Sequence, residues 1–158
     1  VPGLCRHYYD NHFWPDKIET CEDEIVLTWL ENHLCMIPME PRRHGCSVIE
    51  GMNVTKEKVQ TLAKAADNCW EAIMNTDLEL FAKAYKDSFN AQVAMFPAMI
   101  QGCVQNYIDK YSAIDDILAW KMPGAGGGGY LACVVKDTES FCKNHPEAIK
   151  LKIRRSGF

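Results

Sequence analysis

The sequence predicts an α+β fold whose sheet is mainly antiparallel. Two observations favour this class. Apolar residues recur every three or four positions from about residue 56 to residue 111, which is the spacing of amphipathic helices, whereas short alternating or continuous apolar runs occupy both ends of the chain. Helical and extended segments are thus grouped along the chain, which is typical of folds with an antiparallel sheet and, we expect, helices on one face.

The first 52 residues predict short extended segments around one helix. The predicted elements are strands at residues 6–9, 17–21 and 34–39, a helix at 23–31, and a further extended piece at 47–51. Because Pro38 has no backbone N–H to donate, it confines the strand at 34–39 to a sheet edge, or else lies at the strand's end.

Three amphipathic helices are predicted in the middle of the chain. The first spans residues 56–74, and a capping box, Thr76-x-x-Glu79, predicts the start of the second. Pro97 suits the first position of a third helix that continues to Tyr111. Their apolar stripes predict core packing rather than a cofactor site.

A different pattern follows Asp116. A strand is predicted at residues 117–122, a glycine loop at 123–129, a buried strand at 130–135 and a short helix from Asp137 to Lys143. In the last segment Ile149, Leu151 and Ile153 alternate with basic residues, which predicts a half-buried strand with a solvated basic face.

Composition excludes several classes of function. The net charge of -4 gives no general attraction to nucleic acid, and no apolar run is long enough to cross a membrane. None of the eight cysteines forms a C-x-x-C pair, so we expect no metal site and reduced thiols in a cytoplasmic protein. The chain begins with Val1 rather than Met, so we also expect it to be a fragment.

The most distinctive segment is the glycine loop. Five of the six residues from Gly124 to Gly129 are glycine, and such a run predicts positive φ angles or a very close approach of the backbone to a phosphate or another loop. A strained hairpin turn is the plainer alternative. The Walker A pattern fails because Tyr130 and Leu131 follow the loop, in place of Lys and Ser or Thr.

Two other phosphate-binding patterns fit poorly. The dinucleotide pattern G-x-G-x-x-G matches at Gly124, Gly126 and Gly129, but it should open a helix, and a strand is predicted here. The protein-kinase glycine loop does run from strand to strand, but too little chain follows Lys136 for its catalytic segments.

The strand–GAGGGG–strand segment resembles the C-terminal motif of the GHMP kinases. The three helices, with Ser88-Phe89-Asn90-Ala91-Gln92 and Phe96-Pro97, and the closing residues 150–158 are similar to the C-terminal domain of that family. Further upstream, Pro2-Gly3-Leu4, Trp29-Leu30-Glu31, Met39-Glu40-Pro41-Arg42-Arg43 and Val48-Ile49-Glu50 resemble the fucose-kinase and heptose-kinase branch most. The resemblance implies a ferredoxin-like C-terminal domain at residues 53–158, joined through residues 1–52 to an N-terminal kinase half.

The resemblance implies an ATP-dependent sugar or sugar-phosphate kinase that uses Mg²⁺, of which this chain is one part. The family's phosphate loop, of the P-x-x-x-G-L-x-S-S type, is absent, so we expect no catalytic residue and no activity from this chain alone. The candidate site residues are the loop residues near the phosphates and two arginines as substrate contacts, namely Gly124, Ala125, Gly126, Gly127, Gly128, Gly129, Arg42 and Arg43.

Several alternatives remain at this point. The chain could be a non-catalytic binding module derived from a kinase, or one subunit of a split kinase, and a homodimer could form through a face left uncovered by the absent half. Arg42, Arg43 and His44 could be a solvated turn. His7 and His12, near Tyr8, Tyr9 and Trp14, could line a sugar site, or these aromatic residues could simply pack.

Overall fold

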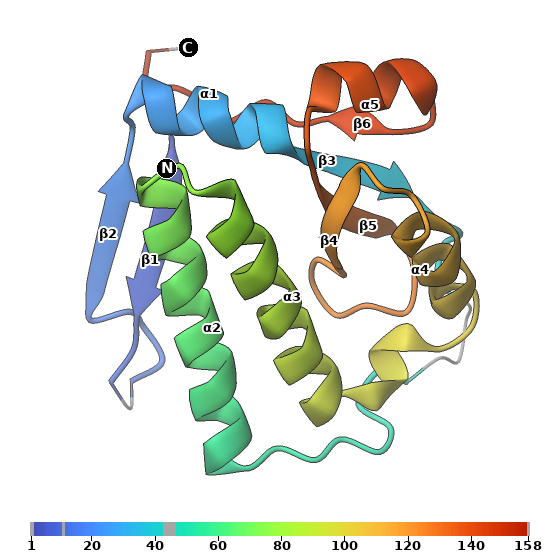
Figure 1. Cartoon of the computed structure of the whole chain (residues 1–158). Helices are drawn as coiled ribbons and strands as arrows, with labels where there is room; N and C mark the ends of the chain where they lie inside the picture. Colours follow the sequence, from blue (N-terminus) through green and yellow to red (C-terminus); the bar gives the residue numbers. More distant parts are fainter. Residues whose placement is uncertain (1, 11, 43–46, 158) are drawn as a thin grey trace.

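A four-stranded antiparallel sheet lies at the centre of the protein and confirms the α+β class (Figure 1). Its strands are β3 (Leu34–Pro38), β4 (Ile117–Lys121), β5 (Tyr130–Val135) and β6 (Ile149–Lys150), in the order β4-β5-β3-β6. The structure, a computed structural model, describes residues 2–10, 12–42 and 47–157. β3, which precedes residue 52, pairs with β5 and β6, so the first part of the chain contributes a strand to the same sheet as the rest.

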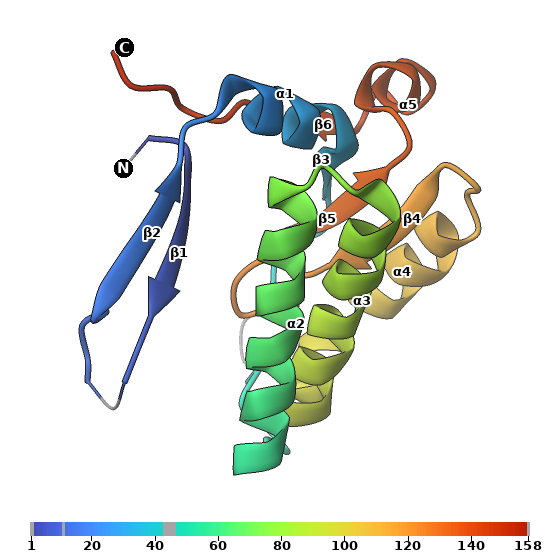
Figure 2. The same ribbon diagram turned by 60° about the vertical axis from the view of Figure 1, so that its left-hand side comes forward.

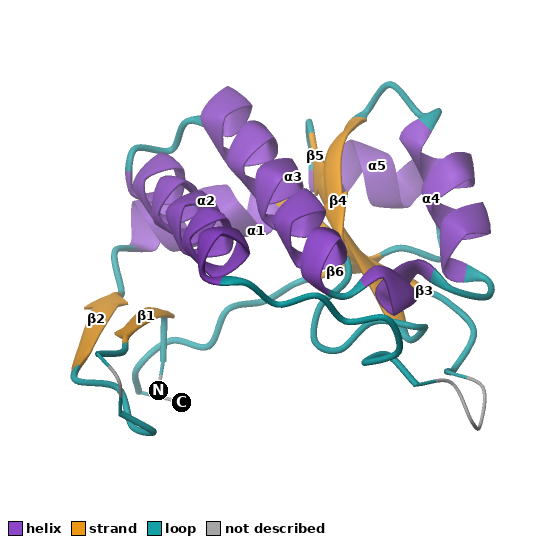
Figure 3. Ribbon diagram, turned by 90° about the horizontal axis from the view of Figure 1, so that it is seen from below, coloured by secondary structure: helices purple, strands orange, loops and turns teal. Residues whose placement is uncertain are grey.

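Helices cover both faces of this sheet, which corrects the expectation of helices on one face (Figure 3). α2 (Lys56–Met74) and α3 (Leu78–Met95) lie on one side, while α4 (Val104–Ser112) and α5 (Thr138–Asn144) lie on the other. The reason is visible in β5, where residues 131–135 are all buried although successive side chains point to opposite faces. A continuous apolar strand of this kind needs cover on both sides.

The two faces carry separate apolar clusters. The larger one lies on the side of α4 and α5 and contains Cys35, Ile37, Met39, Phe89, Met99, Val104, Ile108, Tyr111, Ile117, Met122, Leu131, Cys133, Val135 and Phe141. The smaller one lies under α2 and α3 and contains Leu30, Ala72, Phe81, Ala82, Ala119 and Val134. α1 (Glu24–His33) runs across the end of the sheet and leads directly into β3.

A β-hairpin stands apart from this body beside α2 (Figure 2). It consists of β1 (Leu4–Tyr8) and β2 (Lys17–Cys21), which form a separate two-stranded antiparallel sheet. β2 has the predicted bounds, whereas β1 begins two residues before the predicted strand at 6–9 and ends one residue earlier. The guanidinium of Arg6 pairs with Asp67 on α2 and connects the hairpin to the body.

Pro38 is the last residue of β3, which is one of the two positions that the sequence allowed, and β3 itself is an interior strand. Three local predictions need correction. Residues 48–51 form a turn rather than a strand. The cap of α3 is Asp77, whose side chain accepts from the Leu80 N–H, and not Thr76, which has φ of 52°. Only Ile149 and Lys150 of the last predicted strand join the sheet.

The third predicted helix is broken in two. A 3₁₀ turn, η1 (Pro97–Ile100), comes first, and α4 begins only at Val104. Gly102 lies between them with φ of 66°, a conformation that ends a helix readily. In the described part of the chain, no helix is long and apolar enough to cross a membrane.

Candidate functional site

The glycine loop joins two neighbouring antiparallel strands, β4 and β5, as the sequence predicts. Gly124, Gly126, Gly127, Gly128 and Gly129 all have positive φ, between 69° and 145°. The backbone of this segment therefore takes conformations that other residues rarely adopt. The loop has two parts with different surroundings.

The second part of the loop is held by the protein itself. The Gly127 N–H donates to the Met99 carbonyl at 2.8 Å, and the Gly129 N–H donates to the Glu40 carbonyl at 3.0 Å. A Cβ at Gly126 would lie 2.8 Å from Met99 Cβ, and one at Gly128 would lie 2.6 Å from the Glu40 oxygen. The close approach that the glycines allow is therefore an approach to the chain's own backbone and side chains.

The first part of the loop is exposed. Pro123, Gly124 and Ala125 lie at the surface, and a Cβ at Gly124 would meet nothing within 4 Å. Within the described ranges, the amides of Gly124 and Ala125 have no hydrogen-bond partner from the backbone. The side-chain nitrogen of Gln92 donates to the Gly124 carbonyl at 3.4 Å. The side-chain oxygen of Gln92, Oε1, is buried and has no hydrogen-bond partner among the described residues. The exposed amides are thus the groups in this loop that are free to meet a ligand.

Arg42 anchors the loop. Its Nε and Nη2 donate to the Gly126 carbonyl at 3.1 and 2.8 Å. The predicted substrate contact is therefore next to the glycine loop, but two of its donors are already engaged. Arg43 and His44 lie outside the described residues.

Asp116, before β4, and the histidines of the hairpin have partners of their own. Asp115 and Asp116 precede β4 at the end opposite to the glycine loop, and Asp116 pairs with Lys136 at 3.5 Å. On the hairpin, the His7 ring contacts the Tyr9 hydroxyl at 3.4 Å and the His12 ring contacts Asp16 at 2.8 Å. Phe13 and Trp14 are exposed at the hairpin tip, edge to face with each other.

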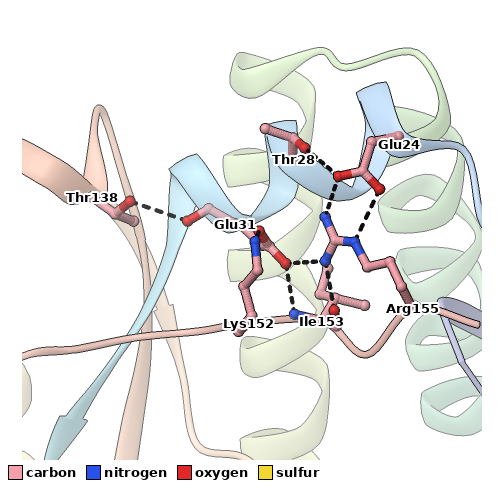
Figure 4. Close-up of polar contacts among 7 residues, drawn as sticks. All are labelled: Glu24, Thr28, Glu31, Thr138, Lys152, Ile153 and Arg155. Atoms are coloured by element: carbon pink, nitrogen blue, oxygen red, sulfur yellow. Dashed lines mark hydrogen bonds and ion pairs between the residues drawn. The ribbon is translucent and has the colours of Figure 1, made fainter. Parts of the chain in front are cut away.

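Lys150, Lys152 and Arg154 are exposed, as the predicted basic face requires, and two basic residues of the segment pair with carboxylates on α1 (Figure 4). Arg155 contacts Glu31 and bonds Glu24 at 2.8 Å, and Lys152 bonds Glu31 at 2.8 Å. Burial raises the pKa of Glu31, but hydrogen bonds from Lys152, Arg155 and the Ile153 N–H outweigh it, so the net pKa is lowered. These cations are neutralised and do not form an anion site.

Sequence reasoning missed a cleft of about 500 Å³ beside the glycine loop. It is lined by Cys5, Arg6, His7, Leu30, Leu34, Ala66, Cys69, Trp70, Ile73, Phe81, Tyr85, Ser88, Lys121 and Pro123. The Lys121 ammonium donates to the Ser88 hydroxyl at 2.5 Å inside it. The only signal in the sequence was a lysine at the end of an otherwise apolar strand, directly before the loop.

Known proteins give no assignment for this site. No protein-family model matches the chain, and no curated protein sequence matches it. Among the described residues, no three His, Cys, Asp or Glu side chains are grouped so that they could hold a metal ion. The function therefore has to be argued from the loop and its surroundings.

Proposed function

We propose that this chain is the C-terminal half of an ATP-dependent sugar or sugar-phosphate kinase of the GHMP type. The observation that supports it best is the division of the glycine loop. Gly126 to Gly129 are fixed by Met99, Glu40 and Arg42, and this anchoring presents Gly124 and Ala125 at the surface with free amides. Anchored glycine backbone with outward amides is a common way to contact phosphate oxygens.

The chemistry would be shared between two halves. Phosphoryl transfer depends on positioning the phosphates and neutralising their charge, which in this family is the work of an N-terminal phosphate loop and of Mg²⁺. The exposed amides would add hydrogen bonds to the phosphates or to the substrate from the opposite side. The free thiols of Cys5, Cys21, Cys35, Cys69, Cys103, Cys133 and Cys142 agree with a place in the reducing cytoplasm, which we also propose.

Calorimetry with ATP and Mg²⁺ tests the division of labour on the 158-residue chain. We expect no heat, or only millimolar affinity, because the main phosphate-binding loop is not in this sequence. Micromolar affinity would show that the glycine loop holds the nucleotide unaided, and the proposed sharing between halves would be wrong.

The kinase activity itself is tested on the product of the natural gene with its upstream sequence. We expect that sequence to encode the P-x-x-x-G-L-x-S-S loop and the protein to phosphorylate one of a panel of hexoses, deoxyhexoses and heptose phosphates. Ala125→Glu should lower kcat/KM at least tenfold, because it places a negative charge at the loop tip, whereas Ala125→Gln should change it little. An upstream sequence without a phosphate loop, or no phosphorylated sugar, contradicts the proposal.

A further inference from the structure

The cleft beside the glycine loop is formed by parts of the chain that are distant in sequence. Cys5, Arg6 and His7 of the hairpin line it together with residues of α2 and α3, and Lys121 at the end of β4 lines it as well. Its volume of about 500 Å³ falls within the usual range for pockets that bind small molecules.

Most of the cleft surface is apolar. Leu30, Leu34, Trp70, Ile73 and Phe81 supply aliphatic and aromatic walls. A sugar ring would leave most of its hydroxyls without partners against such walls, because burying an unpaired hydroxyl is unfavourable. The walls fit a ligand whose body is apolar.

The charges in the cleft are all positive. Although the protein has a net charge of -4, no Asp or Glu is among the residues that line the cleft, whereas Arg6 and Lys121 both are. Arg6 has its counter-ions on the neighbouring surface, since it pairs with Asp67 and Glu71. Lys121 has no carboxylate partner among the described residues, and its ammonium donates to the neutral Ser88 hydroxyl at 2.5 Å.

The neighbouring thiol does not supply the missing negative charge. Burial raises the pKa of Cys69 to about 11, so this cleft residue stays neutral near pH 7. An ammonium that is largely removed from water and lacks a counter-ion is costly, and a bound anion would relieve that cost.

One hydroxyl group lies beside the ammonium, and a second one lines the same cleft. Tyr85 and Ser88 are three residues apart on α3, so their side chains project from the same face of the helix, and both line the cleft. The Tyr85 hydroxyl has no hydrogen-bond partner in the described part of the protein, and it is therefore free to donate. The ammonium and these hydroxyls together suit a carboxylate, sulfonate or phosphate head group.

We propose that this cleft binds a small organic anion, with the anionic head at Lys121 and an apolar body between the hairpin and α2. This inference does not depend on the kinase assignment, because it uses none of the glycine-loop amides. It also identifies Lys121, rather than Arg42 or the C-terminal basic residues, as the cation that is available to a ligand.

A matched pair of fluorescent probes tests the proposal on the intact chain. The probes are 8-anilinonaphthalene-1-sulfonate, which is an anion, and N-phenyl-1-naphthylamine, which has a similar body without the charge. We expect the anionic probe to bind the wild-type protein at least tenfold more tightly than the neutral one. Lys121→Met should remove that preference, Lys121→Arg should keep most of it, and Lys64→Met, at an exposed lysine outside the cleft, should have no effect.

The neutral probe also reports on folding of the variants. Unchanged binding of this probe to the Lys121→Met variant, together with an unchanged circular dichroism spectrum, would show that the cleft is intact and only the charge is lost. The proposal is overturned if the anionic probe binds the Lys121→Met variant as tightly as the wild-type protein. It is equally overturned if the wild-type protein binds both probes with the same affinity, because the cleft would then be an apolar groove without a preference for anions.

Discussion

The C-terminal segment, which lies on α1, and the region from Lys121 to Gly129 differ in whether their polar groups have partners within the chain. In the C-terminal segment, Arg155 and Lys152 meet Glu24 and Glu31, and the Ile153 N–H donates to Glu31 at 2.7 Å (Figure 4). In the second region, the Lys121 ammonium has only a hydroxyl partner, and the amides of the exposed Gly124 and Ala125 have no backbone partner among the described residues.

This difference shows that a cluster of basic residues in a sequence is a poor guide to an anion site. Four basic residues near the C-terminus are conspicuous in the sequence, yet three of them pair with carboxylates of the same chain. The single lysine at the end of β4 is not conspicuous in the sequence, yet it is partly buried and no carboxylate among the described residues pairs with it. Substitutions that remove one group at a time test this contrast.

The largest effect is expected at the anchored side of the glycine loop. Gly128→Ala should lower the free energy of unfolding by about 3 kcal/mol, because its φ is 145° and a Cβ would meet the Glu40 oxygen at 2.6 Å. Gly124→Ala should lower it by only about 1 kcal/mol, because φ is positive but the space is open. Urea unfolding of both variants measures this, and equal losses would mean that the loop is not anchored at Gly128.

The next effect is expected at the centre of the C-terminal contacts. Glu31→Gln should lower the free energy of unfolding by about 2 kcal/mol, because this buried carboxylate accepts charge-assisted hydrogen bonds from Lys152 and Arg155. The control is Glu139→Gln, which removes an exposed pair with Lys150 and should leave stability unchanged. A similar loss in both variants would contradict the special role of Glu31.

Lys121 is expected to respond in the opposite direction. Lys121→Met should raise the free energy of unfolding by about 1 kcal/mol, because it removes a partly buried cation without a counter-ion. Burial lowers the pKa of Lys121 below the 10.5 of the unfolded chain. Between these two pKa values the unfolded state binds more protons than the folded state. The free energy of unfolding of the wild-type protein should therefore rise relative to that of the variant as pH rises.

Urea unfolding of this pair at neutral and alkaline pH measures both effects. A Lys121→Met variant less stable than the wild-type protein at pH 7 would mean that Lys121 already has an ionic partner. The contrast between the two regions would then be lost.

The smallest effect is expected at Glu24, at the exposed end of the C-terminal contacts. Hydrogen bonds from Arg155 and Thr28 lower the pKa of Glu24 from 4.5 to about 2 in the folded protein. Its contribution to stability is therefore present above pH 4.5 and is lost as pH falls from 4.5 to 2. Unfolding curves of the wild-type and Glu24→Gln proteins should differ at pH 7 and coincide near pH 2. A difference that persists at pH 2 would contradict the ionic origin of the effect.

Local patterns in the sequence predicted most of the elements. α2 begins and ends at the predicted residues because its apolar stripe is continuous, and the continuous apolar run at residues 130–135 likewise predicted β5. The break before α4 was missed because Pro97 and the stripe favour one continuous helix. In the structure, Gly102 has a positive φ and separates η1 from α4.

The site could be predicted only in part, because its geometry depends on contacts between distant residues. The sequence identifies the glycine loop, but the partners that anchor it, Met99 and Glu40, come from elsewhere in the chain. Glu31 meets Arg155 across more than a hundred residues, and no local signal marks that pair. The presence of helices on both faces likewise follows from the burial of residues 131–135 in β5, which a short apolar run indicates but does not prove.

The contacts that fix the C-terminal segment also bring the two ends of the chain together. The Gly3 N–H donates to the Arg154 carbonyl at 2.7 Å, and both ends lie on the same side of the molecule (Figure 2). A linker of a few residues would be enough to join them, and a circularly permuted chain with new ends in an exposed turn would keep every strand of the sheet. In the same way, any polypeptide attached before Val1 and any attached after Phe158 would leave the body at nearly one point, so a single adjoining domain could contact both attachments.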